Sequence, residues 1–202
     1  MREFRQVRGS VVVLDRADID TDQIIPKQFL KRIERSGYGE FLFFDWMKDP
    51  DFELRRPGAT GASILLTGRN FGCGSSREHA AWALEDAGFR VVLAPSFGDI
   101  FHQNALKTGL AVIEIDDDAL ASIRAALADD GELTVDLERC EIRHDGGLRV
   151  EFGFDPFARG MLLDGLDEIA LTLRRDEAIA RYERAHPTRI DTRLAGGLSA
   201  AR

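Results

Sequence analysis

The sequence is poor in cysteine and histidine, the residue types that bind iron-sulfur clusters and structural zinc. It contains two cysteines and four histidines among 202 residues. Cys73 and Cys140 form no Cys-x-x-Cys or Cys/His pattern, and the histidines are scattered without ligand spacing. We therefore expect that this chain alone holds neither an iron-sulfur cluster nor a four-ligand zinc site.

The sequence also lacks an excess of basic residues and any long apolar run. Its net charge is -8, with acidic and basic residues mixed along the chain, whereas a nucleic-acid partner requires a basic stripe. No apolar run approaches the roughly 18 residues of a membrane span, and residues 1–6 form no apolar signal-peptide core. We expect a cytoplasmic protein that binds neither nucleic acid nor membrane, although local arginines can still bind a small anion.

The most informative segment that is present is the glycine-rich stretch 68–79, Gly-Arg-Asn-Phe-Gly-Cys-Gly-Ser-Ser-Arg-Glu-His. Its glycines allow positive φ angles and close approach to a ligand. Ser75 and Glu78 match a capping box, which predicts a helix over residues 76–87. Free N–H groups at a helix start and the fork of Arg77 suit a carboxylate or phosphate. The alternative is structural, with Ser75 as a simple N-cap and Arg77 as a solvated residue.

The rest of the pattern predicts an α/β protein. Residues 11–14 have the pattern of a buried strand. From residue 62 onward, apolar strands over 62–67, 90–94 and 110–115 alternate with helices over 76–87 and 99–107, which indicates a parallel β-α-β-α-β core. Residues 133–137, 140–143 and 148–152 alternate like antiparallel strands, with a hairpin turn at 145–147. Helical pieces follow over 155–163 and 167–184. We expect one domain over residues 1–187, with 27–61 as a mobile substrate loop and connection, and a disordered tail over 188–202.

An acidic segment precedes the substrate loop. Residues 15–22 contain four aspartates, but the glycine and glutamate that a calcium loop needs at its sixth and twelfth positions are absent. Calcium is therefore not expected there. An Asx-type turn at Asp20-Thr21-Asp22 is one interpretation of the segment.

Three motifs together resemble a known family. Residues 68–80, Asp-Thr-Asp-Gln-Ile-Ile-Pro at 20–26 and Ala-Pro-Ser-Phe-Gly-Asp-Ile-Phe at 94–101 resemble the small subunits of 3-isopropylmalate dehydratase, in the aconitase superfamily. The resemblance extends over about residues 8–185 and implies a swivelling β/β/α domain.

The resemblance also implies that this chain is half of an enzyme. In that family a [4Fe-4S] cluster is held by a large subunit, and the heterodimer isomerises the dicarboxylate 2-isopropylmalate to 3-isopropylmalate through isopropylmaleate, in leucine biosynthesis. The expected cofactor is therefore the cluster of the large subunit, with no metal bound by this chain. The expected partners are that large subunit and a small dicarboxylate substrate.

Site residues follow from the same resemblance. It makes Ser75 the catalytic base and Arg77 the clamp for a substrate carboxylate, and it places Thr21 and Asp22 in the site. We expect Ser76 to contact substrate, and we expect Ser76 or the backbone itself to take over the helix cap if Ser75 faces the substrate. Two further expectations belong to the loop after residue 26, where Arg32 binds substrate and Leu30 lies nearest the isopropyl group.

Other functions remain open at this level. A homoaconitase-type or citraconate-type small subunit would share the chemistry with a different dicarboxylate. A cysteine hydrolase or acyltransferase would use Cys73 as its nucleophile. A non-catalytic protein could bind phosphate at the glycine-rich loop, although this loop lacks the Gly-Lys-Ser/Thr ending of a P-loop.

Overall fold

The computed structural model describes residues 1–31, 34–127 and 131–186. The chain divides into two compact units, Met1–Leu166 and Asp167–Arg202. No helix within the described ranges is long and apolar enough to cross a membrane.

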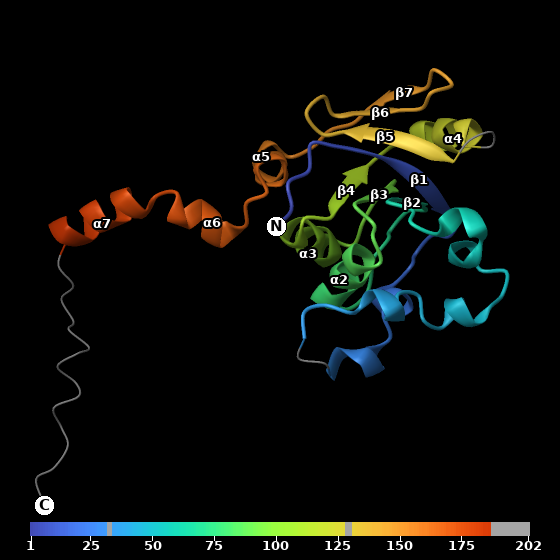
Figure 1. The fold of residues 1–202 in the computed structure, drawn as a ribbon, viewed down its shortest axis with the longest axis horizontal. Coiled ribbons are helices and arrows are strands. Elements are labelled where there is room, and N and C mark those ends of the chain that lie inside the picture. The colour runs from blue at the N-terminus through green and yellow to red at the C-terminus, as the bar shows by residue number, and fades with distance from the viewer. Residues whose placement is uncertain (32–33, 128–130, 187–202) are drawn as a thin grey trace, which may run out of the picture. The chain divides into compact units, whose positions relative to one another are not determined.

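The first unit is built on one sheet with the strand order β4-β3-β2-β1-β5-β6-β7 (Figure 1). The strands are β1 (Gln6–Leu14), β2 (Ile64–Thr67), β3 (Val91–Ala94), β4 (Ala111–Glu114), β5 (Glu132–Asp136), β6 (Glu141–Arg143) and β7 (Arg149–Glu151). The first half of β1 pairs antiparallel with β5, and its second half pairs parallel with β2. One strand thus joins the predicted parallel core to the predicted antiparallel strands, and the α/β fold class is confirmed.

Two apolar clusters cover the two faces of this sheet. The unit contains helices α1 (Thr21–Ile24), α2 (Glu78–Asp86), α3 (Asp99–Thr108), α4 (Asp117–Ala126) and α5 (Pro156–Asp164). Helices α2 and α3 contribute buried residues to one cluster, and α4 and α5 contribute to the other. Side chains of a strand alternate between the faces, so Leu65 joins the first cluster while Ile64 and Leu66 join the second.

The long segment between α1 and β2 contains short 3-10 turns. These are η1 (Lys27–Lys31), η2 (Gly39–Phe41), η3 (Trp46–Lys48), η4 (Glu53–Arg55) and η5 (Pro57–Ala59). Tyr38, Phe43 and Phe52 are buried in the first apolar cluster. The Arg16 guanidinium lies 4.5 Å from the Trp46 ring centroid and forms an ion pair with Glu53 at 3.0 Å. The later part of the expected substrate loop therefore packs on the core, and the mobility of 27–61 stays a prediction.

The second unit contains α6 (Glu168–Leu173) and α7 (Asp176–Ala185). The helical stretch expected over 167–184 is thus two helices separated by Arg174 and Arg175. Asp167 caps α6 by accepting a hydrogen bond from the Ala170 N–H at 2.7 Å. The predicted disordered tail, 188–202, lies outside the described residues.

Candidate active site

The glycine-rich loop follows β2, at the carboxyl end of the parallel strands, where ligands bind in open α/β sheets. It is tied to the acidic segment, because the Gly72 N–H donates to Ile19 O at 2.7 Å and the Thr21 N–H donates to Cys73 O at 3.0 Å. It is also tied to the third motif, because the Gly98 N–H donates to Phe71 O at 2.9 Å. The three motifs that are far apart in the sequence therefore meet in one place.

Ser75 is exposed on this loop and does not cap a helix. Helix α2 begins at Glu78, and its N-cap is Arg77, which forms no side-chain cap hydrogen bond. The expected capping box and the expected helix start at residue 76 are therefore wrong, and Ser76 does not replace the cap either. No hydrogen bond found among the described residues uses the hydroxyl of Ser75 or of Ser76. Both hydroxyls are thus available to a ligand.

Thr21 holds the backbone of Ser75. Its hydroxyl donates to the Ser75 carbonyl oxygen at 2.9 Å, and the residue is only 2% exposed. This contact fixes the peptide beside the candidate base. In this conformation the Thr21 hydroxyl forms a hydrogen bond with the glycine-rich loop. Its expected contact with substrate stays a prediction.

A reciprocal capping box orders the acidic segment. The Asp20 carboxylate accepts from the Gln23 N–H, and the Gln23 side-chain oxygen accepts from the Asp20 N–H, each at 2.8 Å. These bonds start the one-turn helix α1 at Thr21. Sequence reasoning did not use this signal, although the Asp-x-x-Gln spacing contains it. The expected Asx-type turn is therefore a helix cap.

Arg77 and Asp22 form a two-pronged ion pair. Arg77 Nη2 lies 2.7 Å from Asp22 Oδ2, and Nη1 pairs with Oδ1. The Arg77 side chain is 11% exposed, whereas that of Asp22 is 52% exposed. The hydrogen bond from Arg77 lowers the pKa of the Asp22 carboxyl, against the smaller opposing effect of desolvation. The guanidinium is thus already arranged to bind two carboxylate oxygens.

Leu30 lies in η1 and is half-buried against the first apolar cluster. Its neighbour Phe29 stacks on Phe41 with ring centroids 4.0 Å apart. This stacking anchors the turn that carries Leu30. Arg32, the other residue expected in this loop, lies outside the described residues.

Cys73 and His79 do not resemble a nucleophile with its base. Burial raises the pKa of the Cys73 thiol, and the nearby charges of Asp20 and Asp18 raise it further. The His79 ring packs near those of Tyr38 and Trp82, with centroid distances of 5.2 and 4.7 Å. Burial lowers the pKa of His79. The thiol is therefore held in its protonated form rather than activated.

The chain's own residues do not fit a resident iron-sulfur cluster. Both cysteines are free. Among the residues that the structure describes, no three histidine, cysteine or acidic side chains come together as a metal-binding group. A cluster at this site requires ligands from another chain.

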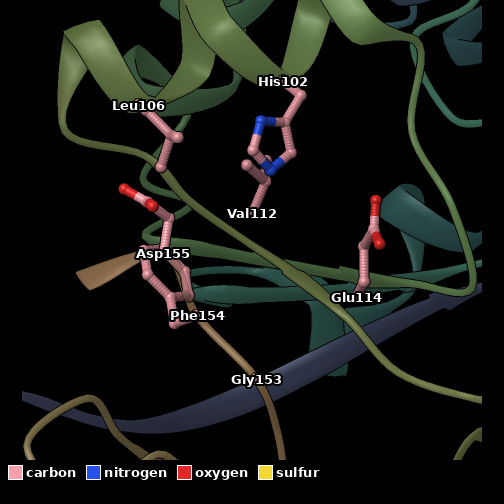
Figure 2. Close-up of a pocket in the computed structure, with 7 residues that line it drawn as sticks. All are labelled: His102, Leu106, Val112, Glu114, Gly153, Phe154 and Asp155. Carbon is pink, nitrogen blue, oxygen red and sulfur yellow. The ribbon is translucent and has the colours of Figure 1, made fainter. Parts of the chain in front are cut away.

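A cavity of about 550 Å³ lies apart from the glycine-rich loop. It is enclosed by α3, β4 and residues 153–155, and Figure 2 shows His102, Glu114 and Asp155 around it. The Asp155 carboxylate already caps α5 by accepting from the Ala158 N–H at 2.8 Å. None of its lining residues belongs to the segment 68–79. Its volume therefore does not describe the space around Ser75.

Comparison with known proteins identifies relatives of this chain. A family model described as the aconitase C-terminal domain matches residues 1–118, and one described as the C-terminal domain of the 3-isopropylmalate dehydratase small subunit matches residues 168–189. The 3-isopropylmalate dehydratase small subunit of Acidobacterium capsulatum is 49% identical, over 100% of this chain and 99% of its own. The small subunit of Koribacter versatilis is 55% identical, over 92% of this chain and 100% of its own.

A solved structure agrees with these matches. The crystal structure of 3-isopropylmalate dehydratase from Methanocaldococcus jannaschii superposes with a TM-score of 0.67 and 25% identity, over 88% of this chain and 99% of the other. Identities of 49% and 55% over nearly the full length of the two small subunits show a shared family as well as a shared fold. The chain therefore belongs to the 3-isopropylmalate dehydratase small subunits of the aconitase superfamily.

Proposed function

We propose that this chain supplies half of the active site of a cytoplasmic hydro-lyase that interconverts 2-isopropylmalate and 3-isopropylmalate through isopropylmaleate. The observation that carries the proposal is that the Ser75 hydroxyl is exposed and caps no helix, two residues before Arg77, whose guanidinium already binds a carboxylate. The first group suits proton transfer and the second suits a dicarboxylate.

Ser75 acts as the base in this proposal. Dehydration breaks a C–H bond, its electron pair forms the carbon-carbon double bond, and the hydroxyl on the adjacent carbon leaves. A serine oxygen accepts such a proton only when its alkoxide form is stabilised. The free N–H groups at the start of α2 and the positive charge of Arg77 provide a suitable local field.

Arg77 binds one substrate carboxylate. Its fork is occupied by Asp22, whose carboxylate is about half exposed and can be displaced toward solvent. A substrate carboxylate would make the same two hydrogen bonds. Asp22 would therefore keep the guanidinium oriented before substrate arrives, and Ser76 is proposed as a further contact with the same ligand.

The remaining part of the site comes from a large subunit that forms a heterodimer with this chain. In this proposal a [4Fe-4S] cluster of that subunit supplies Lewis-acid chemistry for the departing hydroxyl. The exposure of Ser75 and Ser76 and the absence of a ligand set among the described residues support an incomplete site.

The loop that carries Leu30 sets substrate choice in the proposal. An apolar side chain on an anchored turn suits the isopropyl group, whereas a homoaconitase-type enzyme would place a polar distal group there. Arg32 is proposed as a further contact with substrate.

The raised pKa of Cys73 disfavours a cysteine hydrolase or acyltransferase, because its thiolate form is suppressed.

The test is reconstitution. This chain is mixed with the large subunit without oxygen, and isopropylmaleate formation is followed by its absorbance. We expect turnover with 2-isopropylmalate from the mixture and none from either chain alone. Homoaconitate and citraconate are assayed in parallel, and a preference for either would reassign the substrate. A well-formed complex without turnover of any of these acids would refute the lyase proposal.

A further inference from the structure

A second cavity, lined by charged residues, lies at the amino ends of the parallel strands, whereas the glycine-rich loop lies at their carboxyl ends. Its volume is about 820 Å³. Ser63 directly precedes β2 and Arg90 directly precedes β3, so both stand at the amino ends of parallel strands. The Arg90 N–H donates to the Ser63 carbonyl oxygen at 2.7 Å, which holds the two residues side by side. Both line the cavity, together with Arg2 and Glu85.

Several charges around this cavity already have partners. Arg8 forms ion pairs with Glu132 at 3.2 Å and Asp145 at 2.7 Å. Glu3 forms an ion pair with Arg5. The charges of these groups are therefore compensated by partners within the protein, without a ligand.

A third acidic group is engaged in the same way. The Asp86 carboxylate accepts a hydrogen bond from the Tyr38 N–H at 2.8 Å. After this bond and the two sets of ion pairs, the charges that remain at the cavity are those of Arg2, Arg90 and Glu85.

The remaining groups favour an anion. No carboxylate within the described ranges lies at ion-pair distance from Arg2 or Arg90. The Arg90 guanidinium donates a long hydrogen bond, 3.4 Å, to the Glu3 carbonyl oxygen. The Ser63 hydroxyl oxygen is buried and has no hydrogen-bond partner among the described residues. Two cations thus line the cavity, and the unpaired Ser63 hydroxyl lies buried close to Gly9. The one remaining carboxylate, Glu85, interacts electrostatically with Arg90 and offsets part of this positive charge.

Burial affects the two opposite charges differently. It lowers the pKa of Arg90, and the guanidinium of Arg2 lowers that pKa further. Burial raises the pKa of Glu85, which favours its neutral form. A bound anion would offset the repulsion between the two guanidiniums and would satisfy the Ser63 hydroxyl.

We propose that Arg90, Arg2 and Ser63 form a second binding site, for a small oxyanion such as phosphate or a short carboxylate, separate from the site at Ser75. Arg90 and Arg2 supply the charge, and Ser63 donates its hydroxyl hydrogen. Glu85 opposes the anion whenever it is ionised.

The test uses the full chain labelled with ¹⁵N. Inorganic phosphate is titrated in one arm and succinate in another, each at constant ionic strength set with chloride. We expect saturable shifts of the Ser63 and Arg90 amide signals in at least one arm, and the arm with tighter binding identifies the source of the oxyanion. Shifts that are linear, or that follow ionic strength alone, would overturn the proposal.

Three variants separate the site from general salt effects. Arg90→Met keeps the apolar stem and should weaken binding roughly tenfold or more, because it removes a charge-assisted hydrogen bond. Glu85→Gln should strengthen binding, because it removes the opposing charge. Arg149→Met makes the same change in net charge on β7, at an exposed residue that does not line the cavity, and should leave binding unchanged.

The variants also expose the alternatives. Equal weakening by Arg90→Met and Arg149→Met would show a net-charge effect and would refute the site. Weaker anion binding in Glu85→Gln would show that Glu85 supports the anion rather than opposing it, and would refute the proposed arrangement of charges. Each variant's amide spectrum reports whether it is folded, and Ser63→Ala provides a second, smaller change at the same place.

Discussion

The Ser75 hydroxyl is distinguished by what it does not do in the fold. Ser75 is exposed and does not cap α2, and its carbonyl oxygen accepts a hydrogen bond from the Thr21 hydroxyl. A serine in a structural role would use its oxygen for the helix start. The free oxygen beside Arg77 therefore favours a chemical role.

Ser75→Ala should lower kcat about 10²–10⁴-fold with little change in KM, because general-base contributions are of that size. Steady-state kinetics of the reconstituted pair measure both constants. Ser76→Ala is the matched neighbour and should act mainly on KM. Near-normal kcat in an assembled Ser75→Ala complex would remove the base assignment.

Arg77→Lys should raise KM about tenfold or more while retaining the positive charge. Lysine cannot form the planar two-pronged contact that arginine makes with a carboxylate. The measurement is KM for 2-isopropylmalate in the reconstituted enzyme. Unchanged KM would mean that charge alone, or another residue, binds the carboxylate.

The lowered pKa of Asp22 predicts that the stability of the folded chain depends on pH. Its pKa is lowered in the folded state, chiefly by the hydrogen bond from Arg77, so its stabilising effect is fully present above the ordinary carboxyl pKa of 3.8. That contribution is lost as the pH falls through the lower folded value. Urea unfolding midpoints measured from neutral to acid pH should fall less steeply in Asp22→Asn. An equally steep fall in the variant would contradict the assignment.

Cys73 should be dispensable for turnover. Its thiol is shielded and has a raised pKa, so Cys73→Ser should keep a rate close to that of the unchanged chain. The same reconstituted assay measures it. Complete loss of turnover in a folded, assembled variant would revive the cysteine mechanism.

At the scale of elements, the sequence predicted the regular strands and helices well and the caps poorly. Apolar runs and glycines locate β2, β3 and α3 within one or two residues, and Gly109 ends α3 with a φ of 99° as expected. Two segments match the capping-box pattern, and only Asp20 to Gln23 forms one. Local sequence could not choose between them, because the glycine-rich loop is held by tertiary hydrogen bonds: Ile19 O accepts from the Gly72 N–H, and Thr21 donates to Cys73 O and Ser75 O.

The long segment 27–61 shows another limit of local reasoning. Its glycines and prolines predict a loose connection, yet Tyr38, Phe43 and Phe52 are buried. Aromatic side chains without a regular period can fill a core through 3-10 turns. Only the three-dimensional packing partners, such as Trp46 on Phe43 with ring centroids 5.2 Å apart, reveal this.

Gly98 is a position where the packing between two elements leaves no room for a side chain. A Cβ there would lie 2.5 Å from the Gly72 carbonyl oxygen, so α3 and the glycine-rich loop would have to separate. Gly98→Ala should lower stability by about 1–3 kcal/mol, the usual cost of overpacking. Gly160→Ala, with open space at its Cβ inside α5, should instead stabilise by about 0.5–1 kcal/mol. Urea unfolding of both variants measures the contrast, and equal effects would contradict it.

For the whole molecule, the exposed serines of the proposed site support the proposal that this chain needs a partner for catalysis. The parallel core, the acidic segment and the third motif hold the loop firmly, but its serines remain exposed. The sequence alone implied this only through the family resemblance, since the missing metal ligands are compatible with many proteins. In the proposed site, Ser75 would accept the proton and Arg77 would bind a substrate carboxylate, while the electrophile would come from the large subunit.

Binding of the large subunit should therefore slow hydrogen exchange in residues 72–78. Within this segment residues 74–76 are exposed, and closure over substrate requires that the partner exclude water from Ser75. Exchange measured by mass spectrometry, with and without the large subunit, provides the comparison. The buried strand β3 serves as the internal control, because its amides are already protected by pairing with β2 and β4. Unchanged exchange over 72–78 in a complex confirmed by its mass would mean that the large subunit binds elsewhere, and Ser75 could not then lie at a shared active site.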